Sequence, residues 1–297
     1  MALIVLAADK GAPGVTTAAV AIAAVWPRPV LLAECDQAGG DLVYRLPGED
    51  GGMLNPARGM LSLAATARRG LRAEQIWEHT QRLVGGLDVL VGLTNAEQAQ
   101  GLTWLWGPLG RAFADLTVPG SPGDVRDTAP PVNGGPPATT PPAPAVDVVA
   151  DCGRLGAGSV TTDLLREAST IVLFTRATLE HVAHLRERIN SLASELGGHA
   201  APPIGVVVVA DPREYRTSLT EVGRIISNAK LPASVLGGFA LDPKGAEMLR
   251  GRWGGRLDRS LLIRSARQIA GGLAARAAGG PETGREGQGA ASGSQSR

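Results

Sequence analysis

Lysine is scarce in this chain of 297 residues, because only Lys10, Lys230 and Lys244 contribute to its 29 basic residues. The 28 acidic residues leave a formal net charge of +1, which excludes an overall electrostatic attraction to nucleic acid or membranes. Two cysteines, Cys35 and Cys152, are too few for a disulfide framework. The longest apolar run, residues 18–26, is far shorter than a membrane span, and no basic region precedes the apolar N-terminal run. We therefore expect a cytoplasmic protein with no signal peptide and no integral membrane segment.

Short apolar runs recur along the chain and indicate buried strands. They occupy residues 2–8, 30–33, 87–91, 146–150, 171–174, 204–209 and 235–240. Helical patterns cover residues 16–25, 102–116, 179–196, 218–228 and 257–276, the last of them interrupted by Gly271 and Gly272. Strands that alternate with helices are typical of βαβ units. We therefore predict an α/β fold with a doubly wound, mainly parallel sheet of about seven strands and helices on both faces.

One internal segment breaks this pattern. Residues 117–145 contain nine prolines and four glycines, a composition that supports neither a helix nor a strand ladder. We predict a disordered insertion here and a disordered polar tail over residues 279–297, so that one folded domain spans residues 1–278. The insertion is either a tolerated surface loop or a docking peptide for a proline-binding domain.

A glycine-rich turn follows the first predicted strand and opens the first predicted helix. It reads Asp9-Lys10-Gly11-Ala12-Pro13-Gly14-Val15-Thr16-Thr17. In such a turn, backbone N–H groups and the helix N-terminus face a bound anion, and the glycines allow close approach. The Thr16 hydroxyl stands where it would hold Mg²⁺. The turn therefore predicts a phosphate site.

Acidic residues follow two further predicted strands. Asp36 comes after the strand over residues 30–33, and Asp151 directly follows the strand over residues 146–150. In a doubly wound sheet, the carboxyl ends of the strands form the ligand crevice beside the first turn. Two carboxylates facing a phosphate require a cation between them, and Mg²⁺ is the expected one.

These motifs, in this order, resemble those of the ParA/MinD group of P-loop ATPases with the deviant Walker A motif, which position chromosomes, plasmids, division sites and pili. The family motif Lys-Gly-Gly-x-Gly-Lys-Thr-Thr corresponds to residues 10–17. The acids of its second strand match Glu34 and Asp36, and its Walker B aspartate matches Asp151. Its segment that passes the adenine base is similar to residues 237–245.

The resemblance implies ATP or ADP with Mg²⁺ as cofactors, a nucleotide-dependent homodimer and an unidentified protein partner. It implies that Lys10 reaches the phosphates of a second subunit and that Asp36 orients the attacking water. Mg²⁺ would be held by Thr16, Asp36 and Asp151. The nucleotide-binding residues carried over are Lys10, Gly11, Ala12, Pro13, Gly14, Val15, Thr16, Thr17, Asp211 and Asp242.

Several positions depart from the family pattern. Val15 replaces the ordinary Walker lysine, Asp9 replaces the first glycine of the longer P-loop pattern, and Glu34 replaces the more usual aspartate. Ala210, followed by Asp211, replaces the asparagine that contacts the base. A lost charged hydrogen bond to phosphate weakens binding by about 10–100-fold.

Arg154 is a candidate for part of the missing charge. It lies three residues after Asp151, and a guanidinium binds phosphate bidentately. We therefore place it among the candidate catalytic residues with Lys10 and Asp36. The alternative is a solvent-facing arginine in an arginine-rich chain.

The C-terminal region is basic, since residues 250–276 contain seven arginines and one acidic residue. This stretch would suit non-specific DNA binding; contact with anionic lipid and a merely solvated helix face are the alternatives. His181 and His184 share a helix face but have no third ligand nearby, so we expect no metal site there.

The resemblance thus implies a nucleotide-binding protein of chromosome or plasmid partitioning, or of subcellular positioning, with weak ATP hydrolysis. The alternative is a pseudo-ATPase scaffold that recruits division-site, pilus or secretion partners, which the loss of the Walker lysine at Val15 favours. An ATP-dependent ligase on the same fold is less well supported, because no second motif set is visible.

Overall fold

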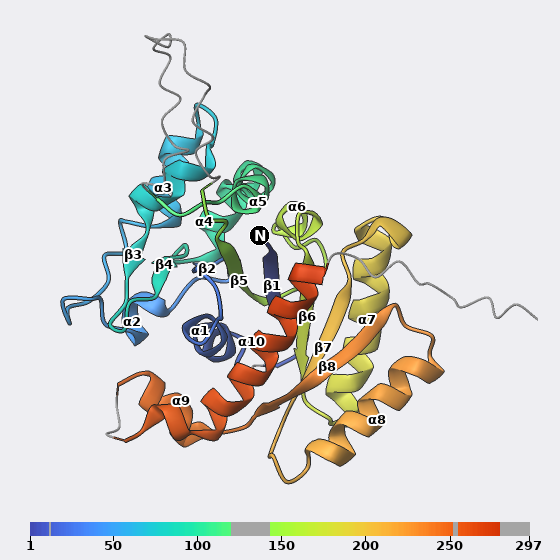
Figure 1. The fold of residues 1–297 in the computed structure, drawn as a ribbon. Coiled ribbons are helices and arrows are strands. Elements are labelled where there is room, and N and C mark those ends of the chain that lie inside the picture. Colours follow the sequence, from blue (N-terminus) through green and yellow to red (C-terminus); the bar gives the residue numbers. More distant parts are fainter. Residues whose placement is uncertain (12, 120–142, 252–254, 280–297) are drawn as a thin grey trace, which may run out of the picture.

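The computed structural model describes residues 1–11, 13–119, 143–251 and 255–279 (Figure 1). The strands are β1 (Leu3–Ala8), β2 (Val30–Glu34), β3 (Gln81–Arg82), β4 (Asp88–Leu90), β5 (Asp147–Arg154), β6 (Thr170–Thr175), β7 (Ile204–Ala210) and β8 (Ala233–Ala240). The α-helices are α1 (Val15–Ala24), α2 (Leu42–Arg45), α3 (Met60–Ala67), α4 (Ala96–Gly101), α5 (Trp106–Ala114), α6 (Thr162–Arg166), α7 (Leu179–Glu195), α8 (Tyr215–Asn228), α9 (Pro243–Leu249) and α10 (Leu261–Gly279). Short 3₁₀ turns are η1 (Ala73–His79), η2 (Thr103–Leu105), η3 (Gly198–Ala200) and η4 (Leu257–Arg259).

The described strands form one eight-stranded sheet in the order β3-β4-β2-β5-β1-β6-β7-β8. All pairs are parallel except β3–β4, which is antiparallel at the sheet edge. The mainly parallel, doubly wound α/β sheet is confirmed. The sequence missed β3, because two residues at an edge carry too little periodicity to be recognised.

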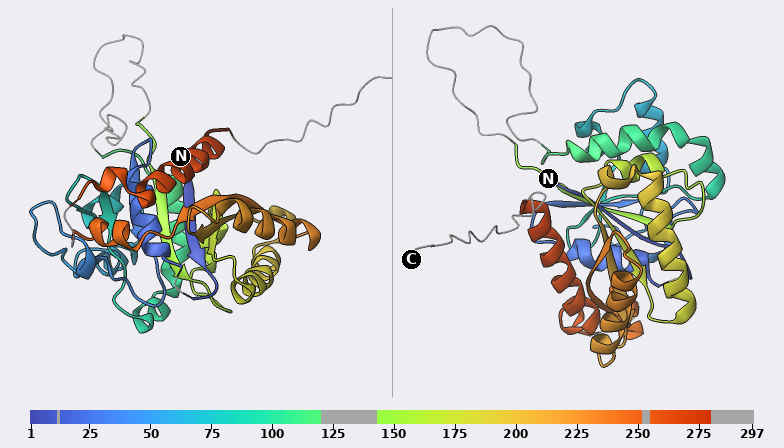
Figure 2. Two further views of the ribbon diagram at one scale, coloured as in Figure 1. Left: turned by 90° about the horizontal axis from the view of Figure 1, so that it is seen from below. Right: turned by 90° about the vertical axis from the view of Figure 1, so that its right-hand side faces the viewer.

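Helices cover both faces of this sheet (Figures 1 and 2). Along β1, Leu3, Val5 and Ala7 pack in the core beneath α3, α5, α6, α7 and α8. The alternate residues Ile4 and Leu6 pack in the second core, which holds α1 and α10. A strand with apolar residues at every position therefore serves two cores, which explains the nearly continuous apolar runs in the sequence.

One expectation about the last helix is wrong. The sequence predicts an interruption at Gly271 and Gly272, but α10 runs through both glycines. Each glycine costs about 1 kcal/mol in a helix interior. Ile269, Ala270 and Leu273 are buried against the α1 face of the sheet, and this packing offsets the cost.

The ends of the predicted insertion lie close together. The Val118 N–H donates to the Pro144 carbonyl at 2.9 Å, and the Val146 N–H donates to that of Leu116 at 2.9 Å. Thr117 and Ala145 form an isolated antiparallel bridge. Of the predicted disordered insertion over residues 117–145, residues 120–142 lie outside the described residues, as does the tail from residue 280. Among the described helices, none has the length and apolar character to cross a bilayer.

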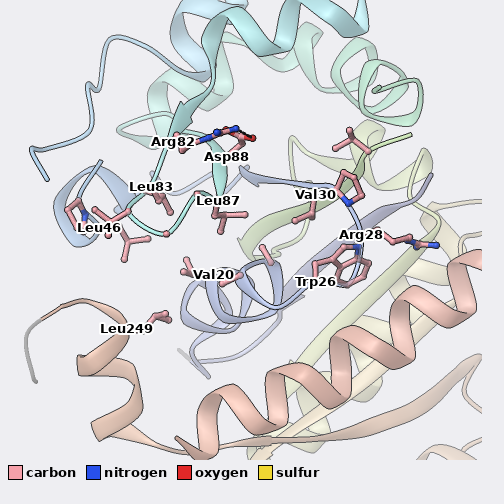
Figure 3. Close-up of a pocket in the computed structure, with 18 of the residues that line it drawn as sticks. Val20, Trp26, Arg28, Val30, Leu46, Arg82, Leu83, Leu87, Asp88 and Leu249 are labelled. Atoms are coloured by element: carbon pink, nitrogen blue, oxygen red, sulfur yellow. Dashed lines mark hydrogen bonds and ion pairs between the residues drawn. The ribbon is translucent and has the colours of Figure 1, made fainter. Parts of the chain in front are cut away.

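A groove of about 680 Å³ opens at the amino ends of the parallel strands (Figure 3). Apolar side chains from α1, β2 and the loop between β3 and β4 line it, among them Val20, Val30 and Leu87. Its charged groups are paired with neighbours. Arg82 binds Asp88 through two hydrogen bonds of 2.9 and 3.0 Å.

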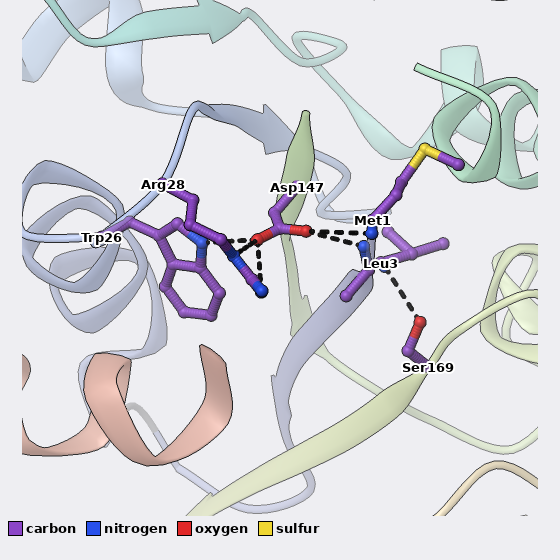
Figure 4. A network of polar contacts seen from close by, with 7 residues as sticks. Met1, Leu3, Trp26, Arg28, Asp147 and Ser169 are labelled. Atoms are coloured by element: carbon purple, nitrogen blue, oxygen red, sulfur yellow. Dashed lines mark hydrogen bonds and ion pairs between the residues drawn. The ribbon is translucent and has the colours of Figure 1, made fainter. Parts of the chain in front are cut away.

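Asp147 anchors the start of the central strands (Figure 4). One carboxylate oxygen accepts the Ala2 N–H at 2.7 Å, and the other accepts the Trp26 indole N–H at 2.9 Å. The same oxygen pairs with the Arg28 guanidinium at 2.7 Å. This carboxylate is only 2% exposed, and its charge is fully compensated.

Candidate functional site

The glycine-rich turn connects β1 to α1 at the carboxyl end of the sheet. Gly11 and Gly14 have φ angles of 68° and 92°, the left-handed region that favours glycine. The Ala18 N–H donates to the Gly14 carbonyl at 2.9 Å, so the helix begins directly after the loop. The first turn of α1 contains no acidic residue that would repel an anion.

A cavity of about 360 Å³ lies against this loop. It is lined by predicted site residues from three elements: Gly11, Pro13, Gly14, Val15, Thr16, Thr17, Asp36 and Arg154. The register explains the meeting, because Ala8 at the end of β1 pairs with Arg154 of β5, and Glu34 at the end of β2 pairs with Asp151. The parallel sheet therefore gathers the three sequence motifs at one crevice, as expected.

Asp36 follows β2 and lies against Gly153. A side chain at Gly153 would collide with the Asp36 carboxylate, and Gly153 also has a φ angle of 56°. One oxygen of Asp36 accepts the Ala38 N–H at 2.8 Å. Burial raises the pKa of Asp36, and the hydrogen bond from Ala38 opposes this shift.

Asp151 lies deeper, with 1% of its surface exposed. Burial raises its pKa to about 7, although the Thr16 hydroxyl and the Gly153 N–H favour the charged form. Gly153 donates to Oδ1 at 3.0 Å, whereas Oδ2 has no hydrogen-bond partner in the described part of the chain. A buried carboxylate oxygen without a partner, beside a hydroxyl and a second carboxylate, fits a divalent cation bound by oxygen ligands.

Glu34 has a structural role. Its carboxylate accepts backbone N–H groups of Asp41, Leu42 and Gly92 at 2.7, 2.9 and 2.9 Å. Burial raises the pKa of Glu34, and these three bonds oppose the shift. Glu34 therefore fixes the turn before α2 and the end of β4, and it does not line the cavity.

Asp9, the unexpected acid of the loop, is neutralised by α7. The Arg188 Nε lies 2.6 Å from Asp9 Oδ1, and the His184 ring lies 3.6 Å from Oδ2. His181, from the same face of α7, lies against Gly11, where a Cβ would approach its Nε2 to 2.9 Å. The spacing 181, 184 and 188 places these side chains on one face of α7, but it does not indicate which part of the fold that face contacts.

Comparisons with known proteins bear on the fold. No protein-family model matches the chain, and no curated protein matches it. A ParA family ATPase from Chlorobium tepidum TLS matches with a TM-score of 0.62 and 13% identity, over 91% of this chain and 97% of that one. A chain of the MinC:MinD cell division protein complex of Aquifex aeolicus matches with a TM-score of 0.58 and 14% identity, over 93% of this chain and 96% of that one. MinD of Pyrococcus horikoshii OT3, complexed with Mg-ADP, matches with a TM-score of 0.57 and 13% identity, over 94% of this chain and 97% of that one.

The chain has the ParA/MinD fold. At these identities the likeness establishes the fold alone, and it agrees with the resemblance of the motifs.

Four of the predicted site residues do not line the described cavity: Lys10, Asp151, Asp211 and Asp242. Asp151 is the buried carboxylate described above. Lys10 is exposed on the loop. Asp211 accepts the N–H of Arg213 at 2.9 Å after β7. Asp242 caps α9 through the N–H of Gly245 at 2.8 Å and also accepts that of Leu262 at 3.2 Å. Their roles toward nucleotide stay predictions, and Ala12 lies outside the described residues.

The cavity also contains two arginines that the sequence did not indicate as site residues. Arg45 ends α2, and Arg250 directly follows α9. In the sequence, Arg250 belongs to the basic stretch considered for DNA; in the fold it lies beside the glycine-rich loop. No spacing rule connects residues 45 and 250 to this loop, because only the packing of α2 and α9 brings them there.

Proposed function

We propose that this protein binds ATP and Mg²⁺ at the cavity beside the glycine-rich loop and acts in partitioning or positioning as a nucleotide-linked dimer. The observation that carries the proposal is the partnerless Oδ2 of Asp151, buried beneath a phosphate-type loop. The MinD match that was solved with Mg-ADP supports the same ligand class.

The loop and its neighbours have distinct roles in this proposal. The N–H groups of residues 14–17 bind the phosphates at the start of α1, while Thr16 and Asp151 hold the cation. When bound, Mg²⁺ supplies positive charge to the phosphate oxygens. Asp36, whose pKa is raised, orients the attacking water and lies against Gly153.

Calorimetric titration with ATP and GTP, with and without Mg²⁺, tests this proposal. We expect Mg²⁺-dependent binding in the parent protein and its loss in Asp151→Asn. Equal binding with and without Mg²⁺ would contradict the cation site.

Dimerisation is the finer part of the proposal. Lys10 is exposed on the face of the loop, so it is available to a second subunit. We expect Lys10→Ala to abolish an ATP-dependent dimer in light scattering, whereas Lys230→Ala, a control at another exposed lysine, leaves it intact. A Lys10→Ala protein that dimerises like the parent would refute the role of Lys10.

A pseudo-ATPase scaffold is the second candidate, and Val15 is the observation that favours it. The Val15 side chain is 6% exposed and belongs to the core, so it offers no cation to a phosphate. Nucleotide binding without measurable phosphate release would support this candidate, while steady turnover that Asp36→Asn abolishes would exclude it.

DNA binding through residues 250–276 is a separate part of the proposal. Arg256, Arg259, Arg264 and Arg267 are exposed, although Arg267 donates to the Asp258 carbonyl at 3.0 Å. Affinity for random duplex DNA should fall steeply with salt. Arg256→Glu combined with Arg264→Glu should abolish binding; unchanged binding would remove this stretch as the site.

A further inference from the structure

Three guanidinium groups from separate elements line the cavity beside the glycine-rich loop. Arg45 comes from α2, Arg154 from the end of β5, and Arg250 from the residue after α9. Asp36 is the one acidic side chain among the described lining residues. The lining therefore carries an excess of positive charge at the start of α1, where the helix dipole also favours an anion.

Among the described residues, each arginine is tethered by one contact. Arg45 pairs with Asp41, four residues earlier, and Arg250 pairs with Glu247 at 3.0 Å. The Arg154 Nε donates to the Asp9 carbonyl at 2.9 Å, which fixes the guanidinium beside the loop. A guanidinium has five N–H donors, so each group retains donors beyond its tether for a ligand.

Arg45 and Arg250 also line a second, smaller hollow, together with Thr16 and Thr17 at the start of α1. Each arginine binds a carboxylate close to it in the sequence, Asp41 for Arg45 and Glu247 for Arg250. Two guanidinium groups that line the same hollow repel each other, and an anion bound between them offsets this repulsion.

The loop itself lacks a cation at this place. Val15 stands where the related motif has lysine, and its side chain packs in the core. Lys10 is exposed and is absent from the described lining of the cavity.

We propose that Arg45 and Arg250, together with Arg154, bind the polyphosphate chain of the ligand and replace the missing lysine of the loop. This inference rests on the proposed nucleotide function, because it names residues of the same site. It assigns phosphate recognition to α2 and to the end of α9. Guanidinium groups bind phosphate oxygens bidentately, so the site should also hold a polyphosphate without a base.

The test uses the full chain and two probes, Mg·ATP and inorganic tripolyphosphate, measured by calorimetry at low salt. We expect Arg45→Gln and Arg250→Gln each to weaken both ligands by about 10–100-fold. The double variant should bind neither. Arg259→Gln is the matched control, since Arg259 is exposed on η4 and does not line the cavity.

Conservative variants separate ligand contact from support of the fold. Arg45→Lys and Arg250→Lys keep the charge and should retain more affinity than the glutamine variants, with melting temperatures close to the parent. Glutamine variants that bind both probes as tightly as the parent would overturn the inference. Lysine variants that bind as weakly as the glutamine variants, despite parental melting temperatures, would also overturn it as a charge replacement.

The outcomes distinguish this inference from the proposed function. If the parent binds Mg·ATP and the glutamine variants match it, the arginine inference fails and the nucleotide function stands. If the parent binds tripolyphosphate through these arginines but does not bind ATP, the inference holds and the nucleotide function fails. A parent that binds neither probe at low salt refutes both.

Discussion

Two aspartates on β5 are almost equally buried, yet their surroundings differ. Asp147, at the amino end, is 2% exposed and receives N–H groups from Ala2, Trp26 and Arg28. Asp151, near the carboxyl end, is 1% exposed, and its Oδ2 has no partner in the described chain. Burial alone therefore does not define a structural carboxylate. The hydrogen-bond partners of the carboxylate distinguish the two roles, and a buried oxygen without such a partner indicates a site for a ligand.

The two ends of the sheet differ in the same way. The groove at the amino ends is mostly apolar. Its Arg82 is bound to Asp88 (Figure 3), and its Arg28 is bound to Asp147 (Figure 4). The cavity at the carboxyl ends has three arginines that retain N–H donors beyond their single tethers. The arginines at the amino ends are therefore bound to carboxylates, whereas those at the carboxyl ends keep N–H donors that a ligand can use.

The largest effect is expected for Asp147→Asn. The substitution removes a buried charge and leaves the Arg28 guanidinium without its counterion, which should destabilise the fold by about 2–4 kcal/mol. Thermal unfolding should show a melting temperature lower by roughly 5–15 °C. Arg82→Gln is the control, because its bond to Asp88 is exposed and contributes little. A parental melting temperature for Asp147→Asn would mean that the network does not stabilise the protein.

Asp151→Asn should have the opposite effect in the absence of ligand. The folded pKa of about 7 exceeds the ordinary value of 3.8, so folding favours the protonated acid. The free-energy cost of burying the ionised Asp151 is absent below about pH 4, grows as the pH rises and reaches its full size above about pH 7. We expect Asp151→Asn to raise the free energy of unfolding by about 1–3 kcal/mol at pH 8 and hardly at all at pH 4.

Denaturant titration at both pH values measures this difference. Destabilisation by Asp151→Asn at pH 8 would show that the carboxylate is as well compensated as that of Asp147, and the contrast between the two would disappear.

Gly153→Ala tests whether ligand binding at the carboxyl ends of the strands depends on the position of the Asp36 carboxylate. The new methyl group would strain a left-handed backbone, at about 1–2 kcal/mol, and would displace the Asp36 carboxylate. Gly158→Ala is a matched control, since Gly158 has a φ angle of 64° and open space around its Cβ position. Both variants should lose similar stability, but only Gly153→Ala should weaken Mg·ATP binding, by roughly 10-fold or more. Equal affinity of the two variants for Mg·ATP would show that the position of Asp36 does not affect ligand binding.

The smallest effect on stability is expected from replacing residues 120–142, the segment that precedes the amino end of β5. Residues 117 and 145 already meet, so a short Gly/Ser linker can replace residues 120–142 without stretching the chain. The free energy of unfolding should change by less than about 1 kcal/mol. A fall of many degrees in melting temperature would show that this segment packs on the domain.

The sequence predicted the parts of the site that depend on local chemistry. The glycines of the loop, Thr16 and the acids at two strand ends could be located because a glycine-rich turn after a buried strand has few structural solutions. The sequence also predicted that His181 and His184 share a helix face, but their contact with the loop could not be predicted. That contact depends on how α7 packs beside β1.

The sequence by itself determined that strands alternate with helices and that polar motifs lie at the ends of three strands, because period-2 and period-3.6 patterns are local properties of the chain. Tertiary structure alone decided which charges meet at the loop. Arg45 and Arg250 are 205 positions apart in the printed numbering, and only the packing of α2 and α9 around α1 brings both to the cavity. The same holds for Asp147 and Asp151, whose different surroundings depend on partners that fold in from distant parts of the chain.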